Sequence, residues 1–342
     1  MCSFVNQEYM RIAVIGAGSW GTTLADLLAK KGFKVDLWVR EEEVYQQIRD
    51  ERENKVFLPG IRLSEEINPV MSFEEALSKK DLVVVAIPSH VLRDVLRQMR
   101  PYIKEEVPFV FATKGIENDT LMLVSEVVED VLSWDISKYF ACIAGPSFAK
   151  EVAREFPTAV TIACKDLKLG RRLQELFFTE YLRVYLINDI IGAQLGGALK
   201  NVIAIAAGAS DGLNFGNNAR AALITRGLAE IMRLGVAMGA DPRTFFGLAG
   251  MGDLVLTCTG DLSRNRTVGF KIGKGMKLKD IVEGMKMVAE GIKTAKAGYA
   301  LSKKMGVEMP ITEQVYQILY EEKDPKDAVK ELMTRKLRME ID

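Results

Sequence analysis

The chain has 342 residues, with 46 Lys or Arg, 46 Asp or Glu and a single His, and 48% of its residues are hydrophobic. This length suggests about two domains and lets the chain bury a large core without disulfides. The zero formal charge argues against nucleic acid as a partner, because phosphate binding at scale needs an excess of Lys and Arg. A single imidazole also argues against most zinc sites and Ser-His-Asp triads, so we expect no metal.

The cysteines and the first ten residues bear on the compartment. The four cysteines, at positions 2, 142, 164 and 258, show no C-x-x-C spacing, and two lie inside apolar runs. This pattern favours buried thiols in a reducing environment. The N-terminal sequence MCSFVNQEYM lacks the basic region and apolar stretch of a signal peptide. We therefore expect a cytoplasmic protein.

The first half of the chain alternates short strand-like runs with helix-like segments, as a βαβ sheet does. The strand-like runs are rich in β-branched and aromatic residues, and several are apolar throughout, which favours parallel strands buried on both faces. Strands are predicted at residues 11–15, 35–39, 82–87, 108–112 and 139–144, and helices at 22–31, 41–53 and 91–100. The pattern predicts a Rossmann-like, doubly wound parallel sheet.

The second half, from about Asn188, is rich in small and apolar residues and lacks strand-like runs. Asp241-Pro242 has the form of a helix start, with Asp as N-cap and Pro at the first helical position. Helices are predicted at residues 190–209, 219–238, 279–288, 293–305, 312–322 and 327–339. We therefore predict an α/β N-terminal dinucleotide-binding domain, residues 1–188, and an all-α C-terminal substrate-binding domain, residues 189–342.

The segment 190–209 is long and apolar enough to cross a bilayer. However, a lysine at mid-helix costs about 2.5–3.5 kcal/mol on insertion scales, and Lys200 and Asn201 lie in its middle. We expect a buried helix and no membrane span. Lys200 must then reach the surface of the helical bundle, find a partner, or sit neutral at a site, where it could act as a general base.

Residues 16–21 read G-x-G-x-x-G, directly after the first predicted strand and at the start of a predicted helix. In this context Gly16 permits a tight turn, Gly18 lets a pyrophosphate approach the backbone, and Gly21 lets the helix pack on the strand. The sequence therefore predicts a dinucleotide site. Arg40 follows the second strand, where an arginine favours the 2′-phosphate of NADP, but the adjacent Glu41 leaves NAD open.

Three further predicted strands end in polar or glycine-containing turns. Lys114 follows the strand 108–112, where its ammonium can meet a carbonyl or phosphate oxygen of a ligand. Gly145 and Ser147 follow the strand 139–144 and suit close approach of a ligand, although turn chemistry also explains Gly-Pro. His90 follows the strand 82–87, and we expect it at a helix start or on the wall of the cofactor site.

Two polar stretches interrupt the helical half. A glycine-rich run, residues 247–252, leads to Asp253, and Ser263, Arg264 and Asn265 follow in a short polar segment. Hydroxyl, guanidinium and amide groups in such a segment can hold a phosphate by charge-assisted hydrogen bonds. A solvated loop is the alternative interpretation.

Taken together, these motifs resemble those of the soluble NAD(P)-dependent glycerol-3-phosphate dehydrogenases, from Arg11 to about Lys336. The segments that carry the resemblance are GAGSWGT, NKVFLPG, ATKG, AGPSFAKE, GALKNV, GLAGMGDLVLTCTG, SRNR and VAEGIKTAKA. The resemblance implies reversible hydride transfer between NAD(P)H and dihydroxyacetone phosphate. The product is sn-glycerol 3-phosphate, the precursor for glycerophospholipid synthesis.

The resemblance also implies roles for individual residues. Lys200 matches the family's general base, which takes the C2 hydroxyl proton while the C2 hydride passes to the nicotinamide. The predicted substrate-binding residues are Lys114, Gly145, Ser147, Lys200, Asn201, Asp253, Ser263, Arg264 and Asn265. The predicted cofactor-binding residues are Gly16, Gly18, Ser19, Trp20, Gly21, Arg40, His90, Lys114, Ala149, Arg264, Val288 and Glu290.

The sequence leaves two alternative functions open. A related two-domain hydroxyacid dehydrogenase would share the sheet, the helical domain and the Lys-Asn pair, but GLAGMGD followed by SRNR argues against it. A non-catalytic dinucleotide-sensing module would keep the glycine motif and lose the base, whereas Lys200, Lys114 and Asp253 are all present. A homodimer is compatible with the sequence, which does not determine the oligomeric state.

Overall fold

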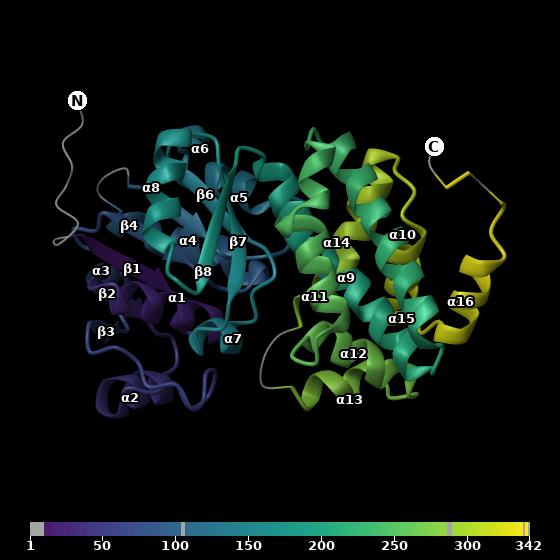
Figure 1. Cartoon of the computed structure of the whole chain (residues 1–342), viewed down its shortest axis with the longest axis horizontal. Helices are drawn as coiled ribbons and strands as arrows, with labels where there is room; N and C mark the ends of the chain where they lie inside the picture. Colours follow the sequence, from purple (N-terminus) through teal and green to yellow (C-terminus); the bar gives the residue numbers. More distant parts are fainter. Residues whose placement is uncertain (1–9, 104–106, 286–288, 338, 341–342) are drawn as a thin grey trace.

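A sheet of eight strands fills the first half of the protein in the computed structural model, which describes residues 10–103, 107–285, 289–337 and 339–340 (Figure 1). The sheet order is β3-β2-β1-β4-β5-β6-β7-β8. The strands are β1 Arg11–Ile15, β2 Lys34–Trp38, β3 Ile67–Val70, β4 Leu82–Val85, β5 Phe109–Phe111, β6 Phe140–Ala144, β7 Thr158–Cys164 and β8 Leu182–Ile187. Neighbouring strands are parallel except for β6 and β7.

The register brings the carboxyl ends of the central strands level with one another. Ile15 at the end of β1 is paired with Trp38 of β2 and with Val85 of β4, and Val85 is paired with Phe111 of β5. The turns that follow these strands therefore meet at one edge of the sheet. In an open α/β sheet this is the edge where ligands bind, next to the point where the strand order reverses between β1 and β4.

Both faces of the sheet are covered by helices, as the apolar strands predicted. Along β1, Ile12 and Val14 belong to one core cluster and Ala13 and Ile15 to another, because successive side chains point to opposite faces. The flanking helices are α1 Ser19–Lys30, α2 Glu42–Glu51, α3 Phe73–Leu77, α4 Leu92–Met99, α5 Val124–Leu132, α6 Ile136–Tyr139, α7 Ala149–Ala153 and α8 Leu167–Phe177. The predicted doubly wound α/β fold is confirmed.

The five predicted strands are present within one or two residues of their predicted bounds, whereas β3, β7 and β8 were not predicted. Two of these three, β3 and β8, are the edges of the sheet. An edge strand has one free side, so β3 tolerates Pro69, which is a poor strand residue elsewhere. In β8 the pattern of exposure alternates instead of being buried throughout. The sheet is also not wholly parallel, since β7 runs antiparallel to β6.

The second half of the chain is helical, as predicted (Figure 1). Its α-helices are α9 Ile190–Gly212, α10 Gly216–Ala237, α11 Asp253–Thr259, α12 Arg264–Gly273, α13 Leu278–Glu283, α14 Glu290–Met305, α15 Pro310–Tyr320 and α16 Pro325–Met333. Two short helical turns, Pro242–Phe246 and Leu248–Gly252, precede α11. Asp241 caps the first of them through its side chain, as the Asp-Pro signal predicted. Residues 286–288, at the end of the predicted helix 279–288, lie outside the described residues.

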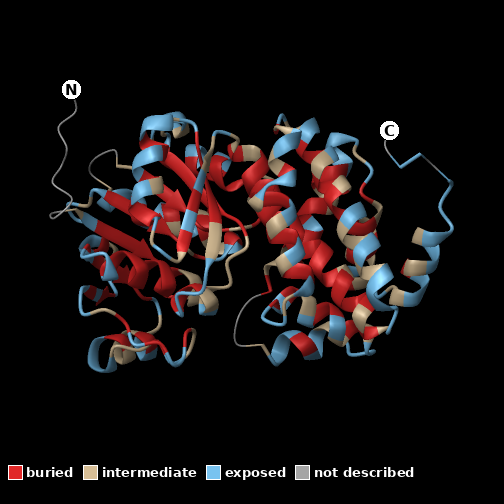
Figure 2. Ribbon diagram, viewed as in Figure 1, coloured by how far each residue is buried: buried red, intermediate tan, exposed pale blue. Residues whose placement is uncertain are grey.

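The long helix α9 forms the centre of this half (Figure 2). Among the described residues it is the one helix long and apolar enough to cross a membrane, and 89% of its most apolar window lies buried inside the protein. A Cβ atom at Gly208 of α9 would lie 2.0 Å from the carbonyl oxygen of Arg266, and one at Gly269 of α12 would lie 2.0 Å from that of Ile205. The backbones of α9 and α12 therefore touch, which fixes the start of α12 relative to Lys200.

Candidate active site

The glycine-rich turn after β1 has the form of an anion site. A Cβ atom at Gly21 would lie 1.9 Å from the carbonyl oxygen of Gly16, so the packing of the turn itself requires this glycine. By contrast, a Cβ atom at Gly18 would meet nothing within 4 Å. Gly18 is the N-cap of α1, so the open space lies where helix N–H groups attract a phosphate. The cradle therefore fits the pyrophosphate of a dinucleotide.

Asn54, to which no motif in the sequence assigns a role, holds this turn in place. Its side chain is fully buried and donates to the carbonyl oxygen of Ala17 at 2.8 Å and to Thr22 Oγ1 at 2.9 Å. The Ser19 hydroxyl donates to the carbonyl oxygen of Phe57 at 2.6 Å. The only signal in the sequence was that Asn54 begins the motif NKVFLPG. Trp20 is half-buried and packs against the core on the same side of the sheet.

Arg40 and His90 lie at the same edge, after β2 and β4. Arg40 is exposed and pairs with Glu41 at 2.6 Å, so the residue that favours NADP is partly neutralised by its neighbour. His90 lies in a short turn at the start of α4. Partial burial, and then the positive charges of Lys293 and Arg40, lower the pKa of His90. Val288, another predicted cofactor contact, lies outside the described residues.

Lys114, Lys200 and Asp253 come together in the structure. Lys114 Nζ lies 2.7 Å from Asp253 Oδ2, and Lys200 Nζ forms an ion pair with Asp253 Oδ1. Lys114 belongs to the turn after β5, Lys200 to α9 and Asp253 to the first turn of α11. This cluster therefore joins the ligand edge of the sheet to the helical half. With both lysines protonated it carries one excess positive charge.

The packing of α9 explains how this cluster forms. A Cβ atom at Gly196 would lie 2.3 Å from the carbonyl oxygen of Ala249 in the turn just before Asp253. Gly196 and Lys200 are four residues apart and so lie on one face of the helix. The close contact at Gly196 therefore brings the start of α11, and with it Asp253, next to Lys200.

Burial lowers the pKa of Lys200 to about 8, and the positive charge of Lys114 acts in the same direction, while the Asp253 carboxylate opposes both. The Asp253 side chain is 1% exposed and that of Lys200 is 9% exposed, against 20% for Lys114. Lys200 can consequently exchange a proton near neutral pH. Of the three interpretations of Lys200, the structure supports a buried lysine that is paired with Asp253 and has a lowered pKa.

Gly145, Ser147 and Ala149 follow β6 at the same edge. The Lys114 ammonium lies 3.4 Å from the carbonyl oxygen of Gly145, which also accepts a hydrogen bond from the Ser147 hydroxyl at 3.2 Å. Gly145 has a φ of +127°, a left-handed value that favours glycine. Ala149 begins α7, and its carbonyl oxygen accepts from Thr23 of α1 at 3.2 Å. The turn after β6 thus faces both the lysine cluster and the nucleotide helix.

Asn201 and Asn265 form a buried amide pair beside Lys200. Asn265 Nδ2 donates to Asn201 Oδ1 at 2.9 Å, and the backbone N–H of Gly291 donates to Asn265 Oδ1 at 2.9 Å. Because the Gly291 N–H can only donate, it fixes which end of each amide faces the other. The pair joins α9, α12 and the start of α14.

Arg264 is the first residue of α12, next to Asn265, and its side chain is exposed. The Ser263 hydroxyl accepts from the backbone N–H of Arg266 at 3.2 Å and so caps α12. Ser263 therefore supports Arg264 and Asn265 at the start of this helix. Glu290, the first residue of α14, interacts electrostatically with Arg264 and accepts from the Ser89 hydroxyl at 2.7 Å.

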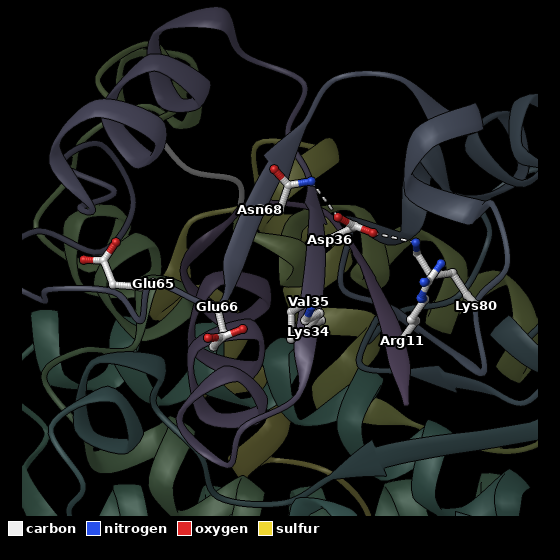
Figure 3. Close-up of a pocket in the computed structure, with 8 residues that line it drawn as sticks. All are labelled: Arg11, Lys34, Val35, Asp36, Glu65, Glu66, Asn68 and Lys80. Atoms are coloured by element: carbon white, nitrogen blue, oxygen red, sulfur yellow. Dashed lines mark hydrogen bonds and ion pairs between the residues drawn. The ribbon is translucent and has the colours of Figure 1, made fainter. Parts of the chain in front are cut away.

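A separate pocket of about 340 Å³ lies at the opposite, amino-terminal edge of the sheet (Figure 3). It is lined by charged residues that neutralise one another. Asp36 pairs with Lys80 at 2.5 Å and accepts from Asn68 at 2.7 Å. No residue of the candidate site lines this pocket. In the part of the chain that the structure describes, no group of three or more His, Cys, Asp or Glu side chains could hold a metal.

Comparisons with known proteins agree along nearly the whole chain. Residues 11–170 match the family described as NAD-dependent glycerol-3-phosphate dehydrogenase N-terminus, and residues 189–330 match the corresponding C-terminus. A glycerol-3-phosphate dehydrogenase, NAD(P)+, of Citrifermentans bemidjiense is 58% identical over 330 residues, which cover 96% of this chain and 98% of the relative. One of Syntrophotalea carbinolica is 56% identical over 97% of this chain and 100% of the relative.

Solved structures show the same similarity. The crystal structure of glycerol-3-phosphate dehydrogenase from Coxiella burnetii has a TM-score of 0.92 and 40% identity, covering 96% of this chain and 99% of that chain. The enzyme from Saccharomyces cerevisiae has a TM-score of 0.80 and 29% identity, covering 94% and 99%. The chain belongs to the NAD-dependent glycerol-3-phosphate dehydrogenase family.

Proposed function

We propose that this protein is an NAD(P)-dependent glycerol-3-phosphate dehydrogenase. It reduces dihydroxyacetone phosphate to sn-glycerol 3-phosphate, or catalyses the reverse oxidation, and so provides the precursor of glycerophospholipids. The observation that carries the proposal is the buried Lys200–Asp253–Lys114 cluster at the ligand edge of a dinucleotide-binding sheet. The relatives reported above bear this activity in their names.

Lys200 is the residue that moves the proton. In the oxidation, its neutral amine takes the proton of the C2 hydroxyl, and the C2–H bonding pair leaves as hydride, so that a C2 carbonyl forms. A bound nicotinamide supplies the hydride acceptor. The pKa of Lys200, lowered by burial to about 8, lets the residue serve as base in one direction and acid in the other.

Asp253 and Lys114 support this step. Asp253 holds both ammonium groups in one place, which keeps Lys200 from turning away and limits the fall of its pKa. Lys114 is more exposed than Lys200 and places a positive charge where the C2 oxygen becomes negative in the transition state. Such preorganised charge is worth most where water is excluded.

The substrate phosphate binds at the start of α12. Arg264 provides a guanidinium, and Asn265 provides an amide N–H whose orientation the Gly291 backbone fixes through Asn265 Oδ1. Ser263 supports them by capping the helix. The proposed substrate-binding residues are Lys114, Gly145, Ser147, Lys200, Asn201, Asp253, Ser263, Arg264 and Asn265.

The cofactor binds along the turns after β1, β2 and β4. The open space at Gly18 supports this placement of the pyrophosphate. Arg40 slightly favours NADP, although its pairing with Glu41 leaves NAD as a cofactor too. The proposed cofactor-binding residues are Gly16, Gly18, Ser19, Trp20, Gly21, Arg40, His90, Lys114, Ala149, Arg264, Val288 and Glu290.

The proposal extends to organisation and location. The domain boundary falls at residues 188/189, between the end of β8 at Ile187 and the start of α9 at Ile190. The protein works in the cytoplasm on small molecules, without nucleic acid or a membrane span. A homodimer is its proposed assembly.

A direct assay tests the proposed function. Dihydroxyacetone phosphate is added to the purified protein with NADH or NADPH, and the loss of the near-ultraviolet absorbance of the reduced cofactor is followed. We expect oxidation with at least one of the two cofactors, and none with dihydroxyacetone at the same concentration. Absence of oxidation with both cofactors would overturn the assignment.

A further inference from the structure

A hydrogen bond between the two halves of the protein lies beside the active site. The hydroxyl of Ser89, in the turn after β4, donates to Oε2 of Glu290 at 2.7 Å. Glu290 is the first residue of α14 and lies 201 residues further along the chain. Ser89 is 7% exposed, and Glu290 is half-buried, so the bond is partly shielded from water. Loss of a donor to a carboxylate in such a place leaves that group poorly solvated.

The pair lies against the turn that carries Lys114. A Cβ atom at Gly115 would lie 2.2 Å from Ser89 Oγ and 3.4 Å from Glu290 Oε2. Gly115 therefore gives the Ser89–Glu290 pair the space it occupies. A shift of Ser89 would therefore displace Gly115, the residue next to Lys114.

The pair also lies beside the expected path of the cofactor. β4 is the neighbour of β1 at the point where the strand order reverses. A Cβ atom at Gly16 would lie 2.7 Å from the carbonyl oxygen of Ala86, which shows that the glycine turn packs directly on the segment leading to Ser89. A carboxylate held at this position can accept a hydrogen bond from a ligand hydroxyl with its remaining lone pairs.

The charges around Glu290 come from two helices. Partial burial raises the pKa of Glu290, while hydrogen bonds from the Ser89 hydroxyl and backbone N–H, and the positive charges of Arg264 and Lys293, oppose that rise. Arg264 belongs to α12 and Lys293 to α14. Among the described residues of the sheet half, Ser89 is the one whose side chain donates a hydrogen bond to this carboxylate.

We propose that Ser89 is a positioning residue for the cofactor: its hydroxyl fixes the Glu290 carboxylate, so that Glu290 can accept a cofactor hydroxyl at the junction of the two domains. This inference rests on the proposed function, because it takes Glu290 as a cofactor contact. Ser89 acts through Glu290 and takes no part in proton or hydride transfer. Its contribution is thus to cofactor binding in the ground state and transition state alike, which changes KM and leaves kcat nearly unchanged.

The test measures binding of reduced cofactor by fluorescence, and KM and kcat by steady-state assay, in wild type and Ser89→Ala. For Ser89→Ala we expect Kd and KM for the cofactor to rise about tenfold and kcat to stay within about twofold. Ser302→Ala is the matched control. Ser302 is also buried and donates to the carbonyl oxygen of Tyr299 at 2.8 Å, within its own helix, so this variant should bind cofactor as wild type does.

A double-mutant cycle separates positioning from a general structural effect. With Glu290→Ala already present, Ser89→Ala should weaken binding by less than about twofold, since its partner is gone. Equal binding by Ser89→Ala and Ser302→Ala, or additive effects of Ser89→Ala and Glu290→Ala, would overturn the inference. If Ser89→Ala does not fold, Ser89→Cys, with similar size and a weaker donor, carries the same expectation. Failure of the wild type to bind either cofactor would refute the proposed function instead.

Discussion

The two sides of the active site are built in different ways. The sheet side offers backbone turns, and its empty space at Gly18 is ready for a ligand to approach the main chain. The helical side offers ionised side chains that are already paired, with Asp253 only 1% exposed between two lysines. The sheet side is suited to hold a large cofactor through many weak contacts. The helical side is suited to move one proton on a small substrate.

The two lysines sharpen this comparison, because they share one acid. Lys114 comes from the sheet side and Lys200 from the helical side, and both bind Asp253. Lys200 is the more buried of the two, and burial lowers its pKa to about 8. Depth in the protein, more than the partner, therefore distinguishes Lys200 as the proposed proton-transfer group.

The largest expected effect is that of removing the Lys200 amine. Lys200→Ala should lower kcat by about two to four orders of magnitude, the usual contribution of a positioned acid or base. Cofactor affinity should be nearly unchanged, because Lys200 is not one of the proposed cofactor-binding residues. Steady-state rates and cofactor titration check both parts. Turnover at the wild-type level would show that another group moves the proton.

The next effect is on stability, through the shared acid. Asp253→Asn leaves two neighbouring ammonium groups without their carboxylate, and we expect a loss of about 3 kcal/mol in the free energy of unfolding, measured in urea. Lys200 can relieve part of this by losing its proton. The control is Asp261→Asn, whose carboxylate is 97% exposed and pairs with Arg266, so the change should stay below about 0.5 kcal/mol. Equal losses in both variants would contradict a buried cluster.

The smallest of the three effects concerns binding of the substrate phosphate. Arg264→Ala should raise KM for dihydroxyacetone phosphate about tenfold to a hundredfold, because a charge-assisted contact to phosphate is lost. Arg243→Ala, which removes an 88% exposed arginine, is the control. An unchanged KM in Arg264→Ala would place the phosphate elsewhere.

The same contrast decided what could be predicted from the sequence. The sheet side depends on contiguous signals, so five of its strands and the fold class were predicted correctly. The edge strands β3 and β8 escaped prediction because a strand with one free side need not be apolar throughout.

On the helical side, the sequence indicated that a buried Lys200 needs a partner or a role at a site. However, its partner Asp253 lies 53 residues away in the chain, and Asn201 and Asn265 are 64 residues apart. Such pairs depend on how helices pack, and here on the close approach of α9 to the turn before α11 at Gly196. The same holds for Ser89 and Glu290, whose contact crosses between the two halves. Asn54 was missed because one buried amide has no periodic signature.

The most direct test of the central claim is the pH dependence of kcat/KM for oxidation of glycerol 3-phosphate, since kcat/KM reports the pKa values of the free enzyme. This direction needs the neutral amine of Lys200, so kcat/KM should rise with pH through about 8, the pKa that burial gives Lys200, and level off above it. In the reduction, which needs the ammonium form, kcat/KM should fall over the same range. If the profile of the oxidation is flat through this range, or if Lys200→Ala shows the same pH dependence as the wild type, the account is contradicted.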